Sequence, residues 1–84
     1  MKKKFRQMIA EILGWYGVAV IVIAYGLISF SIIEVHSIIY QILNATGSFG
    51  IIIHSLTKKD YQPVILNLVW ILIAIIALMQ LILN

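Results

Sequence analysis

The side chains of this sequence that can do chemistry within its apolar stretches are mostly uncharged. Of the four carboxamides in the long apolar runs, Gln41, Asn44 and Asn67 are candidates for binding, while Gln80 lies near the end of the last run. Each carboxamide offers two N–H donors and one carbonyl acceptor, so it can hydrogen-bond the hydroxyl groups of a small solute. Tyr40 and Trp70 lie close to them in sequence and add flat apolar faces that carry one polar atom each. These five residues are the candidate substrate-binding residues.

A polar stripe runs along the middle segment. Ser37, Gln41, Asn44 and Ser48 follow one another at spacings of four, three and four residues, which places them on one face of a helix. Because a carboxamide facing acyl chains lacks hydrogen-bond partners, the stripe is predicted to face protein or a wet cavity. Two interpretations stay open and do not exclude each other: a packing seam with interhelical hydrogen bonds, and a face that lines a solute site.

The third segment carries a comparable face. Steps of three, four and three residues join Asn67, Trp70, Ala74 and Ala77. This face predicts that Asn67 meets Asn44 or Gln41 across the bundle. Three further apolar residues are expected to point elsewhere, where they can meet lipid: Ile71, Ile75 and Leu78.

The titratable residues give little support for catalysis. Glu34 and His36 lie two residues apart and suit either a proton relay or a pair that extends outward from the membrane edge. There is no phosphate-binding glycine loop, no pair of intramembrane carboxylates and no recognisable serine and histidine arrangement. Without cysteine, and with no second ligand at helical spacing from His54, no metal site is predicted. We therefore expect no enzyme, no catalytic residue and no cofactor.

The elements that position these residues are three apolar runs. The chain has 84 residues, of which 63% are hydrophobic and 11% charged. Residues 12–33, 35–56 and 64–83 contain no Asp, Glu, Lys or Arg, and each reaches the roughly 20 residues that a membrane span needs. The prediction is all-α: one membrane domain, residues 1–84, folded as a three-helix bundle with helices at about 9–33, 35–57 and 63–83.

The short first connection makes the first two helices adjacent and antiparallel. Glycines 14, 17, 26, 47 and 50 are expected to permit close helix packing.

The positive charges predict an orientation. Four basic residues precede the first run, Lys58 and Lys59 precede the third, and no other Lys or Arg occurs. Since cytoplasmic loops concentrate Lys and Arg, the N-terminus and second loop are predicted inside, and the first loop and C-terminus outside. The net charge of +3 then reflects topology signals and contacts with anionic lipid, so nucleic-acid binding is not expected. The first run is longer than a signal-peptide core, so Met1–Asn84 is expected to be the mature chain.

The order of several residues resembles a known family. The matching pattern is Glu11-x-x-Gly14-Trp15-x-Gly17, Ala24-Tyr25, Ser37-x-x-Tyr40-Gln41-x-x-Asn44-x-x-Gly47, Tyr61, Asn67 and Trp70. It covers almost the whole chain and resembles a family of small bacterial membrane proteins of unknown function. The resemblance implies a multi-pass protein of the bacterial inner (cell) membrane without an assigned activity.

More distantly, the layout is similar to the SemiSWEET and PQ-loop group, whose three-helix units dimerise to transport small sugars, and to a membrane segment attached to some lipid A disaccharide synthases. Lys59-Asp60, Pro63 and Asn67 carry this likeness, which implies that Asn67 faces the solute. Ser29-Phe30 stands where the group has its Pro-Gln hinge, and Ile51 stands near the place of its pocket tryptophan. The fold and the dimer therefore carry over better than the substrate.

The functional expectation follows from both lines of reasoning. Three helices hardly enclose a polar path, so two copies are expected to form a six-helix assembly. The predicted function is a SemiSWEET-like homodimer that transports or binds a small polar solute, sugar-like or headgroup-like. The alternative is a non-transporting structural or accessory membrane subunit. The expected partners are the lipid bilayer, a second copy and a small polar solute.

Overall fold

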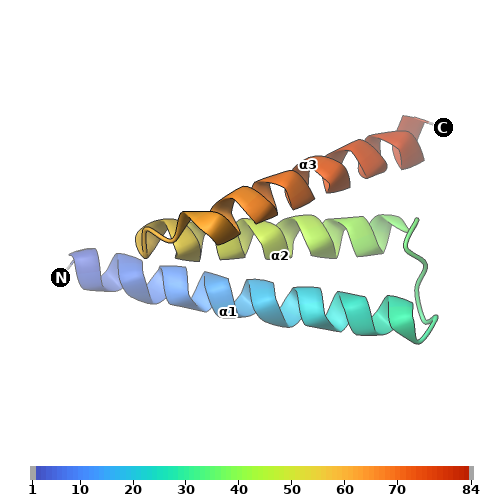
Figure 1. The fold of residues 1–84 in the computed structure, drawn as a ribbon. Coiled ribbons are helices and arrows are strands. Elements are labelled where there is room, and N and C mark those ends of the chain that lie inside the picture. Colours follow the sequence, from blue (N-terminus) through green and yellow to red (C-terminus); the bar gives the residue numbers. More distant parts are fainter. Residues whose placement is uncertain (1, 84) are drawn as a thin grey trace.

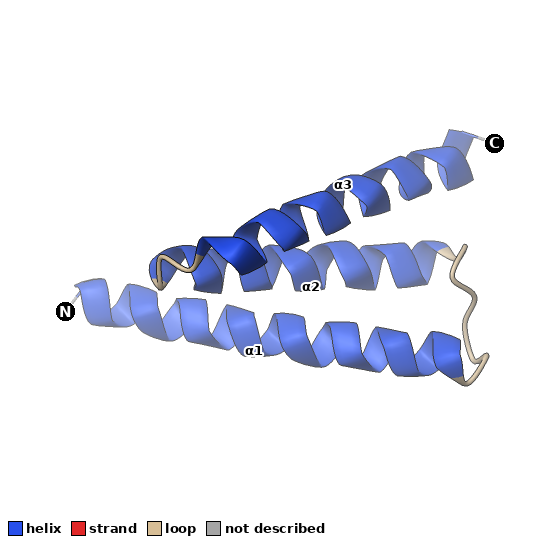
Figure 2. Ribbon diagram, viewed as in Figure 1, coloured by secondary structure: helices blue, strands red, loops and turns tan. Residues whose placement is uncertain are grey.

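The computed structural model describes residues 2–83 and consists there of three α-helices joined by two connections (Figure 1). These are α1 (Lys2–Ser29), α2 (Ile38–Thr57) and α3 (Tyr61–Leu83). The described range contains no strand (Figure 2), and the molecule measures 47 × 24 × 20 Å. The all-α prediction with three helices is confirmed. Met1 and Asn84, the chain ends in the predicted topology, lie outside the described residues.

The three helices form a row with α2 in the middle. α2 packs against both α1 and α3, whereas α1 and α3 do not pack against each other over the described range. α1 and α2 run side by side in opposite directions, as predicted, and α3 diverges from α2 toward its carboxyl end (Figure 1). The buried residues of α3 accordingly lie in its first two thirds, at Val64, Asn67 and Ala74. The three helices thus form an open row, in which only α2 contacts both of the others.

Glycines bring α1 and α2 into backbone contact. A methyl group on Gly17 would overlap the carbonyl oxygen of Gly47, and one on Gly50 would overlap the carbonyl oxygen of Leu13. A methyl group on Gly14 would collide with the ring of His54. The predicted use of glycine in close packing is therefore confirmed at these positions. Gly26 differs, because nothing lies within 4 Å of the place its Cβ would take.

α1 is shifted toward the N-terminus relative to the predicted 9–33. Its basic first two turns are part of the helix, since Lys, Arg, Gln and Met are good helix formers. It ends at Ser29 because Ser31 adopts a φ of 61°. The Ile32 amide then donates to the Leu27 carbonyl at 2.8 Å and the Ser31 amide to the Ile28 carbonyl at 3.1 Å. This hydrogen-bond pair is a Schellman motif, which ends a helix at a left-handed residue.

α2 begins at Ile38 rather than at residue 35, because Ser37 caps it. The Ser37 side chain accepts a hydrogen bond from the Tyr40 amide at 3.2 Å and donates one to the Glu34 carbonyl at 2.6 Å. The first connection thus occupies residues 30–37. It is longer than the corner around Glu34 that the sequence predicts, although it still joins adjacent antiparallel helices.

The second connection is a tight turn. Lys59 has a φ of 55°, and the Asp60 amide donates to the Ser55 carbonyl at 3.0 Å, which repeats the Schellman pattern at the end of α2. α3 then begins at Tyr61, two residues before Pro63. Pro63 lies in the first turn, where amide groups have no intrahelical acceptor, so its missing N–H costs no hydrogen bond.

Candidate functional site

The candidate site is a groove on the face of α2 that lies between α1 and α3. It exists because α1 and α3 leave that face uncovered. Its main part has a volume of about 530 Å³, and its lining residues are Ile21, Val22, Ala24, Tyr25, Ile28, Tyr40, Asn44 and Trp70. A second part of about 250 Å³ shares Tyr40, Asn44 and Trp70 and adds Val35, Gln41 and Ile73. Four of the five predicted binding residues therefore come together here.

Asn44 is the polar centre of this groove. It is half-buried, and its side chain makes no hydrogen bond with any described residue. Tyr40 lies one turn earlier on α2, and Trp70, which is 43% exposed, contributes its indole from α3. The arrangement offers two donors and an acceptor between two aromatic side chains. Such a set can hydrogen-bond a hydroxylated group and cover its apolar face.

Gln41 has a more structural position. Its side chain is buried, and its Nε2 donates to the Val35 carbonyl at 3.1 Å, which ties the start of α2 to the first connection. Gln41 also lines a hollow of about 210 Å³ together with His36, Ala77, Gln80 and Leu81. One donor of Gln41 is thus occupied, whereas both donors of Asn44 are free among the described residues.

Asn67 does not occupy its predicted place. It is buried, and its Nδ2 donates to the Pro63 carbonyl of its own helix at 2.8 Å. Gln41 lies opposite Ala77 and Leu81, and Ala77 is roughly 15 Å along α3 from Asn67 at the rise of a helix. No hydrogen bond between described residues joins Asn67 to Asn44, and Asn67 does not line the groove. The expectation that Asn67 meets Gln41 is wrong, because Gln41 lies opposite the far part of α3, whereas the expectation that Asn67 meets Asn44 stays a prediction.

The packed face of α3 also differs from the predicted one. It follows Val64, Asn67, Ile71, Ala74 and Leu78, where Ile71 and Leu78 are half-buried. These two residues thus belong to the packed face rather than pointing away from it, while Ile75 is exposed. The line repeats every seven residues, as in the seam of two helices packed at a shallow angle. Trp70 lies beside this line, and for that reason it reaches the groove.

The polar stripe of α2 faces protein, as the sequence predicts. Gln41 is 7% exposed and Ser48 is fully buried, while Asn44 lies at the edge of the packed face. The Ser48 hydroxyl has no hydrogen-bond partner among the described residues. The stripe therefore divides: Gln41 and Ser48 lie in the interior, and Asn44 reaches the groove.

Tyr25 is a groove residue that the sequence reasoning did not select. It lies on α1 and lines the groove opposite Tyr40. The alignment of α1 with α2 is the observation that identifies Tyr25. Gly17 contacts Gly47, and because the helices are antiparallel, residues after Gly17 on α1 lie opposite residues before Gly47 on α2. From that pairing, positions near 25 fall opposite positions near 40. Without the register, one tyrosine among many apolar residues carries no such information.

The family is established by comparison with known proteins. The chain belongs to a small family defined by a domain of unknown function. The family model matches residues 10–84, so it covers all three helices but leaves out the basic start of α1. Comparison with curated proteins and with solved structures yields no match. No link to the SemiSWEET and PQ-loop group emerges from these comparisons.

Proposed function

We propose that this protein is a three-span inner-membrane protein that forms a homodimer and binds a small polar solute, sugar-like or headgroup-like, in the groove at Asn44. Two helices, from Lys3 to Ser29 and from Tyr61 to Leu83, are long and apolar enough to cross a membrane. They run in the same direction (Figure 1), so if both cross, α2 must cross back between them. With 20 residues α2 is about 30 Å long, which matches a hydrocarbon core.

The distribution of apolar side chains supports a lipid environment. The buried hydrophobic residues are mainly small or branched, namely Ala10, Ala24, Ile52, Val64 and Ala74. Large apolar side chains lie on the surface instead, and Ile12 and Ile82 are 61% and 67% exposed. Water would penalise such a surface strongly, whereas acyl chains do not.

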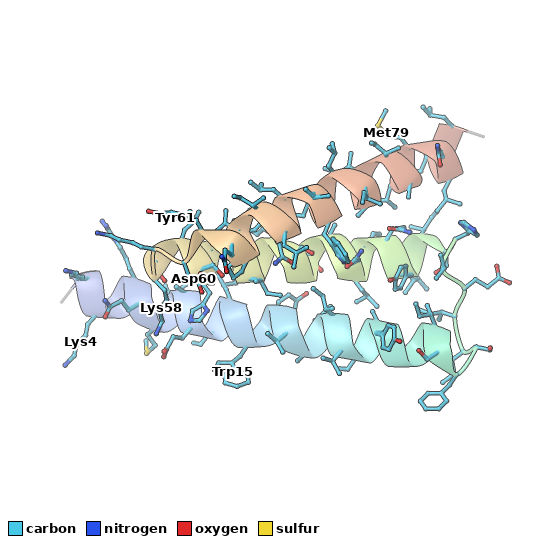
Figure 3. The ribbon with its side chains drawn as sticks, viewed as in Figure 1. Lys4, Trp15, Lys58, Asp60, Tyr61 and Met79 are labelled. Carbon is cyan, nitrogen blue, oxygen red and sulfur yellow. The ribbon has the colours of Figure 1, made fainter. Side chains whose placement is uncertain are left out.

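The basic residues support the orientation. Those near the start of α1, such as Lys4, and those of the second connection, Lys58 and Lys59, lie at the same end of the molecule (Figure 3). The opposite end carries the first connection with Glu34 and His36. By the preference of Lys and Arg for the cytoplasmic side, the N-terminus and second connection face the cytoplasm.

One observation carries the proposal of solute binding: Asn44 presents an amide without an intramolecular partner inside a membrane-level groove. A free amide in hydrocarbon costs on the order of several kcal/mol, so a partner must be supplied from outside the chain. A hydroxylated solute can supply it, and Tyr40 and Trp70 can pack on the apolar face of the solute.

The groove also supports the homodimer. It is open toward the side, so one chain cannot enclose a solute, and a second copy related by two-fold symmetry can close it. Gly14, Gly17, Gly47 and Gly50 are already used between α1 and α2, whereas Gly26, next to Tyr25, has open space around it. The dimer contact is therefore placed on the rims of the groove, where Tyr25 and Trp70 lie.

The test is solute binding and uptake by the purified protein. A panel of sugars, polyols and nucleosides is measured in nanodiscs and in proteoliposomes against empty vesicles. Asn44→Leu is expected to weaken binding of the active solute about tenfold. This is the effect of losing one hydrogen bond and leaving the polar group of the solute without a partner. Gln80→Leu is the matched control, because it removes a carboxamide of α3 that does not line the groove. Equal affinity of Asn44→Leu and wild type would refute the site, and inactivity of the whole panel would count against transport.

The apolar character of most groove residues favours one alternative, an accessory subunit that receives a helix of another protein. Ile21, Val22 and Ile28 offer a surface suited to such a helix, with Asn44 as its single polar contact. A photo-crosslinker at Trp70 distinguishes the two functions. A product with twice the mass of the chain supports the homodimer, and a reproducible product with one different protein supports the accessory role.

A further inference from the structure

A second hollow lies at the opposite end of the molecule from the first connection and has a different chemistry. It has a volume of about 330 Å³ and lies between the start of α1 and the end of α2. Its lining residues are Lys4, Gln7, Met8, Glu11, Thr57 and Lys58. Five of these six side chains are polar, whereas the groove at Asn44 is mainly apolar.

The shape of this hollow follows from the unequal lengths of the helices. Glu11 of α1 is level with Lys58, since their side chains approach to 3.8 Å. α1 therefore extends past the end of α2 by the residues before Glu11, which is roughly 13 Å at the rise of a helix. The extension is visible in Figure 1, and Lys4 and Lys58 both lie at this end in Figure 3. The side of α1 and the end of α2 thus form a step.

The charges of the residues that line the step favour binding of a singly charged anion. Lys4 and Lys58 contribute two positive charges and Glu11 one negative charge, which leaves a net charge of +1. The contact between Lys58 and Glu11 is weak, because both side chains are more than half exposed, at 58% and 59%. Lys58 can therefore turn an N–H group toward an anion without giving up a strong ion pair.

The neutral side chains complete a set of donors. Gln7 supplies amide N–H groups to the step. The Thr57 hydroxyl donates to the His54 carbonyl at 2.6 Å, so its hydrogen is already used. The Gln7 amide, the Lys4 ammonium and the Lys58 ammonium, which contacts Glu11 only weakly, can thus bind the oxygens of a phosphate, and Met8 adds an apolar surface beside them.

We propose that this step binds the phosphodiester headgroup of an anionic phospholipid such as phosphatidylglycerol. The proposal rests on the membrane topology above but not on the solute site. The step lies at the cytoplasmic membrane surface in that topology, where headgroup phosphates are found. Glu11 selects a singly charged phosphodiester over a doubly charged phosphate monoester, because a second negative charge would face its carboxylate.

The experiment measures how much phosphatidylglycerol stays bound to the purified full-length protein in native mass spectrometry, with phosphatidylcholine as the neutral comparison. The double variant Lys4→Gln/Lys58→Gln is expected to lower the affinity for phosphatidylglycerol roughly thirtyfold, because it removes about two direct hydrogen bonds from lysine to the headgroup phosphate. The matched control Lys3→Gln/Lys59→Gln makes the same change in charge outside the step. Its affinity for phosphatidylglycerol is expected to stay within about threefold of wild type, because salt screens the attraction between an exposed lysine and a headgroup that it does not contact.

Three outcomes would overturn the proposal: equal losses in the two double variants, equal retention of phosphatidylcholine, or displacement of the lipid by inorganic phosphate, which would assign the step to free phosphate. Glu11→Gln is expected to increase retention of phosphatidic acid several-fold, and unchanged selectivity would contradict the role given to Glu11. Circular dichroism confirms that each variant keeps its helices. Asn44→Leu is expected to keep its bound phosphatidylglycerol, so failure of the solute proposal and failure of this one are distinguishable.

Discussion

Gly17 of α1 lies directly against the backbone carbonyl of Gly47 of α2, with no room for a side chain between them. Gly50 and Leu13 repeat this relationship about one turn away. The two helices are therefore held at backbone distance, and this close pair forms one wall and the floor of the groove at Asn44.

Gly17→Ala is expected to destabilise the protein by about 1–3 kcal/mol, because the added methyl group forces the two backbones apart. The free energy of unfolding can be measured by denaturant titration in detergent micelles. Gly26→Ala is the control, since its methyl group meets empty space, and it is expected to be neutral or slightly stabilising. Equal destabilisation by both substitutions would contradict the close packing.

Ser31→Gly is expected to stabilise the protein by about 0.5–1 kcal/mol. Ser31 has a φ of 61°, a conformation that costs free energy for a residue with a Cβ and not for glycine. Ser29→Gly, in the last turn of α1, is expected to have the opposite sign, because glycine weakens a helix. The same titration measures both, and a loss of stability in Ser31→Gly would argue against the Schellman ending.

Ser37→Ala is expected to cost about 1 kcal/mol, since it removes the acceptor for the Tyr40 amide at the start of α2. Ser37→Asp restores an acceptor and is expected to recover most of the loss. Hydrogen exchange at the Tyr40 amide reports the cap directly. Unchanged exchange in Ser37→Ala would show that the cap does not form.

The topology predicts which positions a membrane-impermeant thiol reagent reaches in intact cells. The chain contains no cysteine, so single cysteines at Lys3, Glu34 and Lys59 give unambiguous labelling. Position 34 is expected to react from outside, and positions 3 and 59 only after the membrane is permeabilised. External labelling of position 3 or 59 would overturn the orientation.

Much of this structure is predictable from sequence, but its details depend on local backbone chemistry. The three helices and the pairing of α1 with α2 follow from apolar runs and a short connection. The end of α1 is not predictable in the same way, because it depends on a left-handed backbone conformation at Ser31. Glycine would indicate that conformation in a sequence, but serine does not. The position of α2 between the other two helices is also not predictable. α1 and α3 are apolar around most of their surface, so the sequence does not indicate which of their faces packs against a neighbour.

Some residues of the candidate site are also predictable from the sequence, and others are not. Tyr40, Gln41, Asn44 and Trp70 come together, because helical spacing sets which residues share a face. The hydrogen bond from Asn67 to the Pro63 carbonyl is not predictable, since spacing cannot distinguish an asparagine that bonds across helices from one that bonds within its own helix. Tyr25 was missed because the register of two antiparallel helices depends on contacts between glycines far apart in sequence.

The row of helices makes the width of the groove depend on how α3 is tilted against α2. α1 and α2 form a closely packed pair, because their backbones touch. α3 is attached to that pair only through α2 and the turn at residues 58–60, and it leans outward at its far end (Figure 1). The outward lean of α3 therefore sets how far Trp70 and Ile73 lie from Asn44, and with it the width of the groove.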